Sequence, residues 1–434
     1  MSKTEIIENI KLDKLVHGGQ CLGQTKEGKL VFVWNGLPGE VVDAVTIKKK
    51  SKYSEAIVTK VHKSSPNRIA PLEPDSYIST SPWQIMTFEA ENTAKQTILS
   101  EAYEREGIKK VTWKPFVADL SQEGFYYRNK QEFGFWGDDR GIHTAHFVRG
   151  SHSKQIVDSS ALADEKINAI IPRFVKSIND FAKKQADFTA GDLKTATFRC
   201  SESGEVVMAL FVKKKYDFST FDIPAGLKGF VVYYSNPKSP ASIPTKKLYT
   251  HGDITLTDSV CGKNITYDVL SFFQVNLPVF ETALKKIKTV VKAEQKKAPK
   301  SKVIDMYSGV GTIGICVGVD ILVESDGSNI AMAKLNVEGK DTEVVHATSE
   351  HAVEHITTSG VVIVDPPRAG LHGTLIDRIL DVKPAKLIYL SCNPSTQARD
   401  IRYLSSAYKI SFAQGYNFFP RTPHIESLIV LEKM

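Results

Sequence analysis

The fold of this chain is decided by the stretch Leu390-Ser391-Cys392-Asn393-Pro394-Ser395-Thr396-Gln397. The apolar run before it predicts a short buried strand, and Pro394 suits the first turn of a helix. Cys392 is therefore expected at the carboxyl end of a strand, facing a helix N-terminus. Open α/β sheets bind ligands at that edge, and the positive end of a helix favours a thiolate. A lone cysteine is more often a buried structural residue, so the rest of the sequence must decide.

Around this stretch, the C-terminal part of the chain alternates predicted strands and helices, which indicates a parallel sheet and a Rossmann-like α/β fold. The predicted strands are 303–306, 320–323, 343–346, 361–364 and 387–390. The predicted helices are 329–337, 350–356, 374–380 and 396–404. Residues 409–418 and 425–431 are joined by a short proline-containing segment, which predicts a final antiparallel pair.

A glycine motif follows the first of these strands: Gly309, Gly311 and Gly314 match G-x-G-x-x-G. This motif alone also fits dinucleotide-binding folds. Asp305, four residues before the motif, and Glu324, at the end of the next strand, favour S-adenosylmethionine, because a carboxylate there can bind both ribose hydroxyls. The helix after the glycines is expected to be short, since Gly318 soon follows.

The fourth strand ends in Asp365-Pro366-Pro367-Arg368. The two prolines predict a rigid turn that holds the Asp carboxylate at the same edge of the sheet. The simpler interpretation is a turn that only ends a strand. Related motifs of amino-methyltransferases end in an aromatic residue, so Arg368 argues against methylation of an exocyclic amine.

The first half of the chain has a different pattern. Residues 1–65 read as short strands separated by glycines, which predicts a small β-barrel. Residues 89–105 predict a helix. In the predicted strand 125–135, aromatic residues alternate with Arg128 and Lys130 and could stack on RNA, although an aromatic core strand fits equally well. The rest of this region predicts a mixed α/β domain.

Composition narrows the class of protein. The 434 residues carry a net charge of +7 with five widely spaced cysteines and no C-x-x-C motif. A zinc or iron–sulfur site is therefore not expected, and we predict no metal. The chain shows neither a long apolar run nor the apolar core of a signal peptide, so we expect a cytoplasmic protein without a membrane segment. The lysines at 48–52 could contact a polyanion, or form a solvated face.

Together these motifs resemble the RNA uracil-C5 methyltransferase family, which makes 5-methyluridine in tRNA or rRNA. The resemblance rests on motifs along nearly the whole chain: Gly18-Gly19, Val31-Phe32-Val33, Leu37-Pro38-Gly39-Glu40, residues 271–276, 305–311, 365–371 and 391–394, and His424-Ile425-Glu426. It implies a TRAM barrel at residues 1–65, a central α/β RNA-binding domain at 70–265 and a Rossmann-like catalytic domain at 266–434. Residues 89–117 are then expected to pack on the catalytic domain.

The resemblance also implies roles for single residues. Cys392 would attack uracil C6, and Glu426 would remove the C5 proton. The implied cofactor-binding residues are Gln274, Tyr307, Gly309, Thr312, Glu324 and Asp365. The implied substrate-binding residues are Asp365, Gln274, Phe273, Arg128, Lys130, Lys48, Lys49 and Lys50. The expected cofactor is S-adenosylmethionine and the expected partner is RNA, bound by a monomer, rather than DNA.

One departure from the family concerns a metal cluster. Many relatives hold a four-cysteine iron–sulfur cluster just before the predicted helix at 89–105. Residues 74–84 contain no cysteine here. The chain is thus expected to be a member without the cluster.

Two other functions stay open at this point. An RNA cytosine-C5 methyltransferase usually places its nucleophile after Thr or Pro and uses a second cysteine, whereas Cys392 follows Ser391. A non-catalytic RNA-binding or RNA-remodelling protein would not need Cys392, Asp365 and Glu426 together. Both alternatives differ from uracil-C5 methylation in the product they predict.

Overall fold

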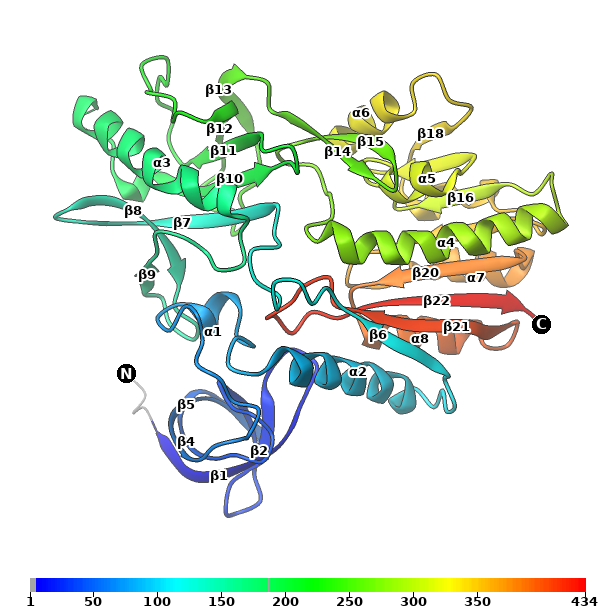
Figure 1. Ribbon diagram of the computed structural model, residues 1–434, viewed down its shortest axis with the longest axis horizontal. Helices are drawn as coiled ribbons and strands as arrows, with labels where there is room; N and C mark the ends of the chain where they lie inside the picture. Colours follow the sequence, from blue (N-terminus) through cyan, green and yellow to red (C-terminus); the bar gives the residue numbers. More distant parts are fainter. Residues whose placement is uncertain (1–4, 186) are drawn as a thin grey trace.

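A computed structural model describes residues 5–185 and 187–434 and contains three main sheets (Figure 1). The first is a closed five-stranded barrel in the order β1-β2-β3-β5-β4. Alternate residues such as Ile10 and Leu12 fill its interior. Its strands are β1 (Ile6–Leu15), β2 (Cys21–Gln24), β3 (Leu30–Trp34), β4 (Val41–Lys49) and β5 (Tyr53–Lys63).

The second sheet has seven strands in the order β13-β12-β11-β10-β7-β8-β9, and α3 (Glu165–Lys184) covers one face. Its strands are β7 (Lys130–Asp138), β8 (Gly141–Phe147), β9 (Lys154–Ile156), β10 (Leu193–Cys200), β11 (Val206–Val212), β12 (Leu227–Tyr234) and β13 (Lys246–Gly252). The strand predicted at 125–135 starts later, at Lys130. The residues before it bond elsewhere, since Asn129 N donates to Val275 O.

The third sheet has eight strands in the order β18-β17-β16-β19-β20-β22-β21-β6. Its parallel part consists of β16 (Val303–Met306), β17 (Ile321–Glu324), β18 (Glu343–His346), β19 (Val361–Val364) and β20 (Lys386–Ser391). The expected antiparallel pair at the end is present as β21 (Tyr408–Tyr416) and β22 (Glu426–Lys433). A Rossmann-like sheet extended by this pair matches the predicted fold class.

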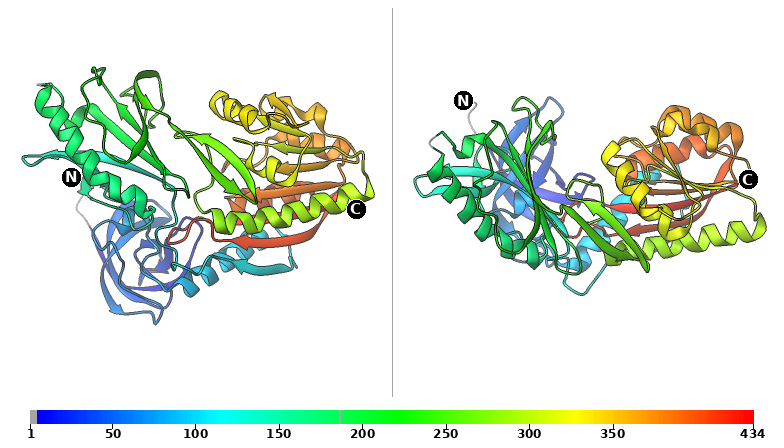
Figure 2. Two further views of the ribbon diagram at one scale, coloured as in Figure 1. Left: turned by 45° about the horizontal axis from the view of Figure 1, so that its top comes forward. Right: turned by 90° about the horizontal axis from the view of Figure 1, so that it is seen from above.

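Helices cover both faces of the eight-stranded sheet (Figure 2). In β19, Val362 and Val364 pack on one side with α2 (Phe88–Arg105), α7 (Gly373–Val382) and α8 (Pro394–Leu404). Val361 and Ile363 point to the other side. There they meet α4 (Leu277–Lys297), α5 (Thr312–Val317), α6 (Gly327–Asn336) and the hairpin of β14 (Thr255–Val260) and β15 (Lys263–Asp268). No helix in the described residues is long and apolar enough to cross a membrane.

The structure differs from one predicted helix and agrees with the predicted length of another. The helix predicted at 350–356 is wrong: the chain forms two 3₁₀ turns there, Ser349–His351 and Val353–His355. As a result, Ser349 and Glu350 lie in the cavity wall at the edge of the sheet. The helix after the glycine motif is short, as expected, because Gly318 ends α5 with a left-handed φ of 84°.

An early segment of the chain completes the catalytic sheet. β6 (Trp113–Val117) pairs in parallel with β21, and α2 packs beside α8. Gly415 on β21 permits this, since a Cβ there would lie 2.6 Å from the Phe116 ring. Residues almost 300 positions apart in the chain thus share one sheet.

A buried ion pair fixes α2 to the loop that precedes β22. Lys95 Nζ lies 2.9 Å from Glu91 Oε1, and both side chains are fully buried. Lys95 Nζ also donates to Asn417 Oδ1 and Phe419 O, at 2.6 and 3.0 Å. Glu91 in turn accepts from the backbone N–H of Arg421. Every donor and acceptor of this cluster helps to hold the segment that leads to Glu426.

Lys95→Met should therefore lower the free energy of unfolding by about 3–5 kcal/mol, because Glu91 would be left as an unpaired buried charge. Urea titration followed by circular dichroism measures this. The matched control is Lys14→Met. It removes an exposed lysine of β1 whose Nζ lies 2.8 Å from Glu101 of α2, the helix that carries Lys95. The control should change stability by less than about 1 kcal/mol. Equal effects of the two substitutions would contradict the role given to Lys95.

Candidate active site

Strand register brings Cys392 and Glu426 together. Ser391 at the end of β20 pairs with Ser427 of the antiparallel strand β22. The next residue along β20 is Cys392, and the preceding residue on β22 is Glu426, so the two stand opposite each other. Both line a cavity of about 730 Å³ at the carboxyl edge of the sheet.

The loop that carries Asp365 is tied to the start of α8. Asn393 Nδ2 donates to Arg368 O at 2.9 Å, and Thr396 Oγ1 donates to the same oxygen at 3.2 Å. Leu371 N donates to Asp400 Oδ2 at 2.8 Å. Because these bonds fix the loop against the turn that carries the cysteine, Asp365 lies beside Cys392 in the cavity wall.

The glycine motif forms the other end of the cavity. Gly309 has a left-handed φ of 57°, and its N–H donates to Glu324 Oε2 at 2.8 Å. Tyr307, also left-handed, accepts a hydrogen bond from Ser349 Oγ at its hydroxyl. Ser308 Oγ is buried and has no partner among the described residues. The cavity floor therefore offers carboxylate, hydroxyl and backbone groups to a polar ligand.

Residues of the central domain donate hydrogen bonds to the 271–276 stretch, which forms part of the cavity wall. Arg199 is fully buried, and its guanidinium donates to Ser271 O at 2.6 Å and to Phe273 O at 3.1 Å. Asn129 Nδ2 donates to Gln274 O at 3.0 Å. These bonds fix the 271–276 stretch so that Phe272, 62% exposed, and Gln274 face the cavity.

The electrostatics of the site are dominated by two buried carboxyl groups. Burial raises the pKa of Glu426 well above its usual range; Asp365 raises it further, and Arg368 opposes this. Burial likewise raises the pKa of Asp365. The pKa of the Cys392 thiol is raised to about 12 by burial, then by Glu426 and Asp365. The expectation of a ready thiolate is thus wrong for the protein alone, because burial and two carboxyl groups outweigh the helix N-terminus.

The structure brings most of the predicted site residues together. Those that line the cavity are Arg128, Gln274, Tyr307, Gly309, Glu324, Asp365, Cys392 and Glu426. Phe273 does not line it: this side chain is 3% exposed and stacks on Tyr267 with ring centroids 4.0 Å apart. Thr312 is buried at the start of α5 and does not line the cavity either.

The predicted lysines lie away from the cavity. Lys130, on β7, is half-buried next to Arg199, and burial followed by that charge lowers its pKa to about 8. In the barrel, Lys48 pairs with Glu55 and Lys49 pairs with Glu5, while Lys50 is exposed. A contact between these barrel lysines and RNA stays a prediction.

Sequence reasoning assigned no role to several residues that line the cavity: Phe272, Ser325, Asn329, Thr348, Ser349, Glu350 and Phe419. Phe272 could have been found, because it is part of the same motif as Gln274. Ser349 and Glu350 follow β18 at the predicted ligand-binding edge, but the sequence predicted a helix from residue 350 and no site there. Phe419 carries no local signal.

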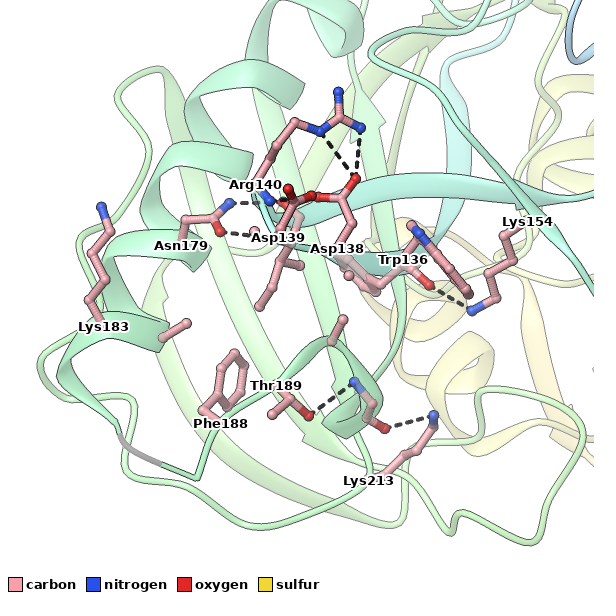
Figure 3. Close-up of a pocket in the computed structure, with 17 residues that line it drawn as sticks. Trp136, Asp138, Asp139, Arg140, Lys154, Asn179, Lys183, Phe188, Thr189 and Lys213 are labelled. Atoms are coloured by element: carbon pink, nitrogen blue, oxygen red, sulfur yellow. Dashed lines mark hydrogen bonds and ion pairs between the residues drawn. The ribbon is translucent and has the colours of Figure 1, made fainter.

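A second hollow, of about 790 Å³, surrounds the turn between β7 and β8 (Figure 3). Its prominent charges already bond to protein: Asp138 pairs with Arg140 at 2.7 Å, and Lys154 Nζ donates to Phe135 O. Asp138 is also eight residues along β7 from the cavity end, roughly 26 Å. The Cys392 cavity is therefore the candidate active site of this chain. Nowhere in the described ranges do three His, Cys, Asp or Glu side chains gather to hold a metal ion.

Comparison with known proteins agrees with this geometry. Residues 105–358 and 353–434 match the family model described as tRNA (uracil-5-)-methyltransferase, and residues 7–59 match the TRAM domain. An uncharacterized RNA methyltransferase of Enterococcus faecalis is 27% identical across all of this chain and 98% of its own length. Another, of Streptococcus pyogenes serotype M3, is 29% identical across all of this chain and 97% of its own length.

A solved structure shares the whole fold. The crystal structure of Pyrococcus abyssi tRNA (uracil-54, C5)-methyltransferase in complex with S-adenosyl-L-homocysteine aligns with a TM-score of 0.75. The alignment covers 97% of this chain and 99% of that chain at 24% identity. The barrel, the central sheet and the catalytic sheet therefore recur together in a second protein.

The fold and its cavity define a Rossmann-like, S-adenosylmethionine-dependent methyltransferase that carries an N-terminal TRAM barrel. With most of its length matched by the family model, the chain belongs to the tRNA (uracil-5-)-methyltransferase family and is an RNA methyltransferase. The residues fit the cofactor: the carboxyl group of Glu324 and the hydroxyl groups of Tyr307 and Ser349 line the cavity beside Gly309.

The raised thiol pKa leads to a prediction about the cofactor. A positive sulfonium beside Asp365 and Cys392 should lower the thiol pKa, since an opposite charge within about 4–6 Å typically favours the charged form. At pH 8, iodoacetamide should thus modify Cys392 about tenfold faster with S-adenosylmethionine bound than with S-adenosylhomocysteine bound, which has a neutral sulfur. Mass spectrometry of the Cys392 peptide measures this, with Cys261 as the reference thiol. Equal rates with both ligands would contradict the electrostatic account.

Proposed function

We propose that this chain methylates C5 of a uridine in structured RNA through a covalent bond between Cys392 and uracil C6. The observation that carries the proposal is the register of β20 and β22, which opposes a thiol and a buried carboxyl group in one cavity. Uracil C5 is a weak nucleophile, so methylation there needs both a nucleophile to activate the ring and a base to release it.

The proposed reaction has two stages on this chain. The Cys392 thiol loses its proton to solvent and the thiolate adds to C6. The electrons of the C5–C6 double bond move to O4 as an enolate, and C5 takes the methyl group as they return. Glu426 removes the C5 proton, the electron pair re-forms the C5–C6 bond, and the C6–S bond breaks. S-adenosylmethionine supplies the methyl group from its sulfonium and leaves as the neutral thioether.

The other cavity residues position the ring. Asp365 lies where a carboxyl group can meet the uracil N3–H, and Gln274 offers an amide to the carbonyl oxygens. Arg128 reaches the cavity from the central domain and brings a positive charge toward the enolate. The raised pKa values of Asp365 and Glu426 follow from two acids buried near each other, so the base becomes ionised only as the neighbouring charges change.

The target nucleotide must leave its stack to reach this cavity. Transfer RNA is the first candidate substrate, because the family model and the Pyrococcus abyssi structure are both named for tRNA. 23S ribosomal RNA is the second. The TRAM barrel supports RNA binding, and the lysines at 48–50 are proposed to contribute phosphate contacts there.

Labelled S-adenosylmethionine tests the function with tRNA and 23S rRNA from a strain that lacks the gene. The expected product is 5-methyluridine in one of these RNAs, and Cys392→Ala should abolish it while S-adenosylhomocysteine still binds. Cys261→Ala, a matched cysteine outside the cavity, should retain activity. RNA containing 5-fluorouridine should form an adduct with wild type only through Cys392. Formation of 5-methylcytidine, or no methylation of either RNA, would overturn the proposal.

Glu426→Gln should trap the enzyme on its natural substrate. Cysteine addition and methyl transfer do not require the base, but release of the C5 proton should slow by about 10²–10⁴-fold. A methylated RNA joined to Cys392 should then appear as a slow band on a denaturing gel. The double variant Cys392→Ala with Glu426→Gln is the control and should show no such band. Normal turnover by Glu426→Gln would remove Glu426 from the role of base.

A further inference from the structure

The TRAM barrel reaches the mouth of the active site through its first turn, residues 16–20. Gly19 packs so closely that a Cβ there would lie 2.7 Å from Pro423 Cβ. Trp83 Nε1 donates to Gly19 O at 3.0 Å and fixes the turn from the other side. Pro423 directly precedes His424, which lines the catalytic cavity. The turn that carries His17 is therefore held against the cavity wall.

Basic side chains from all three parts of the chain gather at this place. The guanidinium of Arg368 lies 3.3 Å from His424 Nδ1 and 3.4 Å from Nε2. Arg128, from the central domain, lines the same cavity. The pKa of His424 is lowered to about 3, by burial first and then by the charges of Arg368, Arg128, Lys95 and His17.

The same positive field acts on the barrel. The pKa of His17 is lowered by burial first, then by Arg368 and Arg105. His17 is exposed as a residue although protein atoms surround enough of its ring to lower its pKa, so only part of the imidazole is open to a ligand. Lys95 is paired with Glu91, which leaves Arg368, Arg128 and His424 as the basic groups that line the cavity, with His17 on the adjoining turn of the barrel.

No acid neutralises this group of bases at the surface. Within residues 5–185 and 187–434, Arg368 contacts His424 and Arg128 donates to the Tyr127 hydroxyl, and neither guanidinium forms an ion pair with a carboxylate. Asp365 and Glu426 line the same cavity, and burial raises the pKa of both carboxyl groups, which favours their neutral forms. Because the pKa values of both histidines are lowered, the positive charges of this group are those of Arg368 and Arg128. Two like charges without a counter-ion cost free energy that a bound anion recovers. An arginine fork beside two imidazoles suits a phosphate, which accepts several charge-assisted hydrogen bonds.

We propose that His17, Arg368 and His424 form a subsite for a backbone phosphate next to the target uridine. This inference rests on the proposed function for the identity of the RNA. When a base is extruded into the cavity, its own sugar and phosphates remain at the opening. Arg368 and His424 line this cavity, and the turn that carries His17 packs against Pro423 beside it. The barrel then contributes directly to the catalytic centre, besides any RNA contact made by its distant lysines.

His17→Ala in the full-length protein tests the barrel's contribution. The matched control is Lys26→Ala, which removes a cation from the exposed turn between β2 and β3 of the same barrel. Filter binding of unmodified tRNA and 23S rRNA transcripts measures Kd without requiring methylation. His17→Ala should weaken the tighter of the two complexes about tenfold, as expected for one charge-assisted bond. It should also lower the slope of log K against log salt by about one.

Lys26→Ala should bind RNA within about twofold of wild type, and both variants should bind S-adenosylhomocysteine normally. If His17→Ala binds RNA as Lys26→Ala does, the subsite is overturned. A failure to methylate RNA would count against the proposed function alone, because this binding measurement does not depend on turnover.

Inorganic phosphate tests the chemistry of the site directly. In protein labelled at histidine nitrogen, NMR titration should show the pKa of His17 and His424 rising when sodium phosphate replaces sodium chloride at equal ionic strength. His62 lies on β5 away from the cavity and serves as the internal reference. Unchanged pKa values for both His17 and His424 would overturn the assignment of a phosphate.

Discussion

The register between β20 and β22 is the constraint on which the rest of this protein depends. Ser391 opposite Ser427 makes Cys392 and Glu426 neighbours across the sheet edge. A shift of one residue would move every side chain of β22 to the other face, so Glu426 would leave the cavity and its apolar neighbours would leave the core. The buried residues of β22, such as Leu428 and Val430, thus hold the catalytic geometry by packing.

Two buried cations bind backbone or side-chain groups of segments that line the edge of the sheet. Lys95 on α2 holds the segment before β22 through Asn417 and Phe419. Arg199 on β10 holds the 271–273 stretch by its backbone carbonyls. Each cation is fully buried and is compensated by several acceptors, so neither segment can move without leaving a charge unpaired. The cavity is therefore rigid on two sides although its walls come from different parts of the chain.

In the protein alone, the charges around Cys392 keep its thiol protonated. Burial and the acids beside Cys392 raise the pKa of this thiol. Positive groups from the ligand and from Arg368 act in the opposite direction. This arrangement fits the proposed role of Cys392 as a nucleophile that ionises only when its positive cofactor binds.

The sequence by itself determined the α/β class and the ends of the strands, because apolar runs and glycine or proline turns are local signals. Cys392, Asp365, Gly309 and Glu324 were predicted to meet, since parallel strands place their carboxyl ends at one edge. Only the tertiary structure decided between the adjacent residues Phe272 and Phe273, because neighbouring side chains point in opposite directions and a motif does not give the register. It alone joined β6 to β21 and packed the turn that carries His17 against Pro423, since contacts between residues hundreds of positions apart depend on packing that no local pattern encodes.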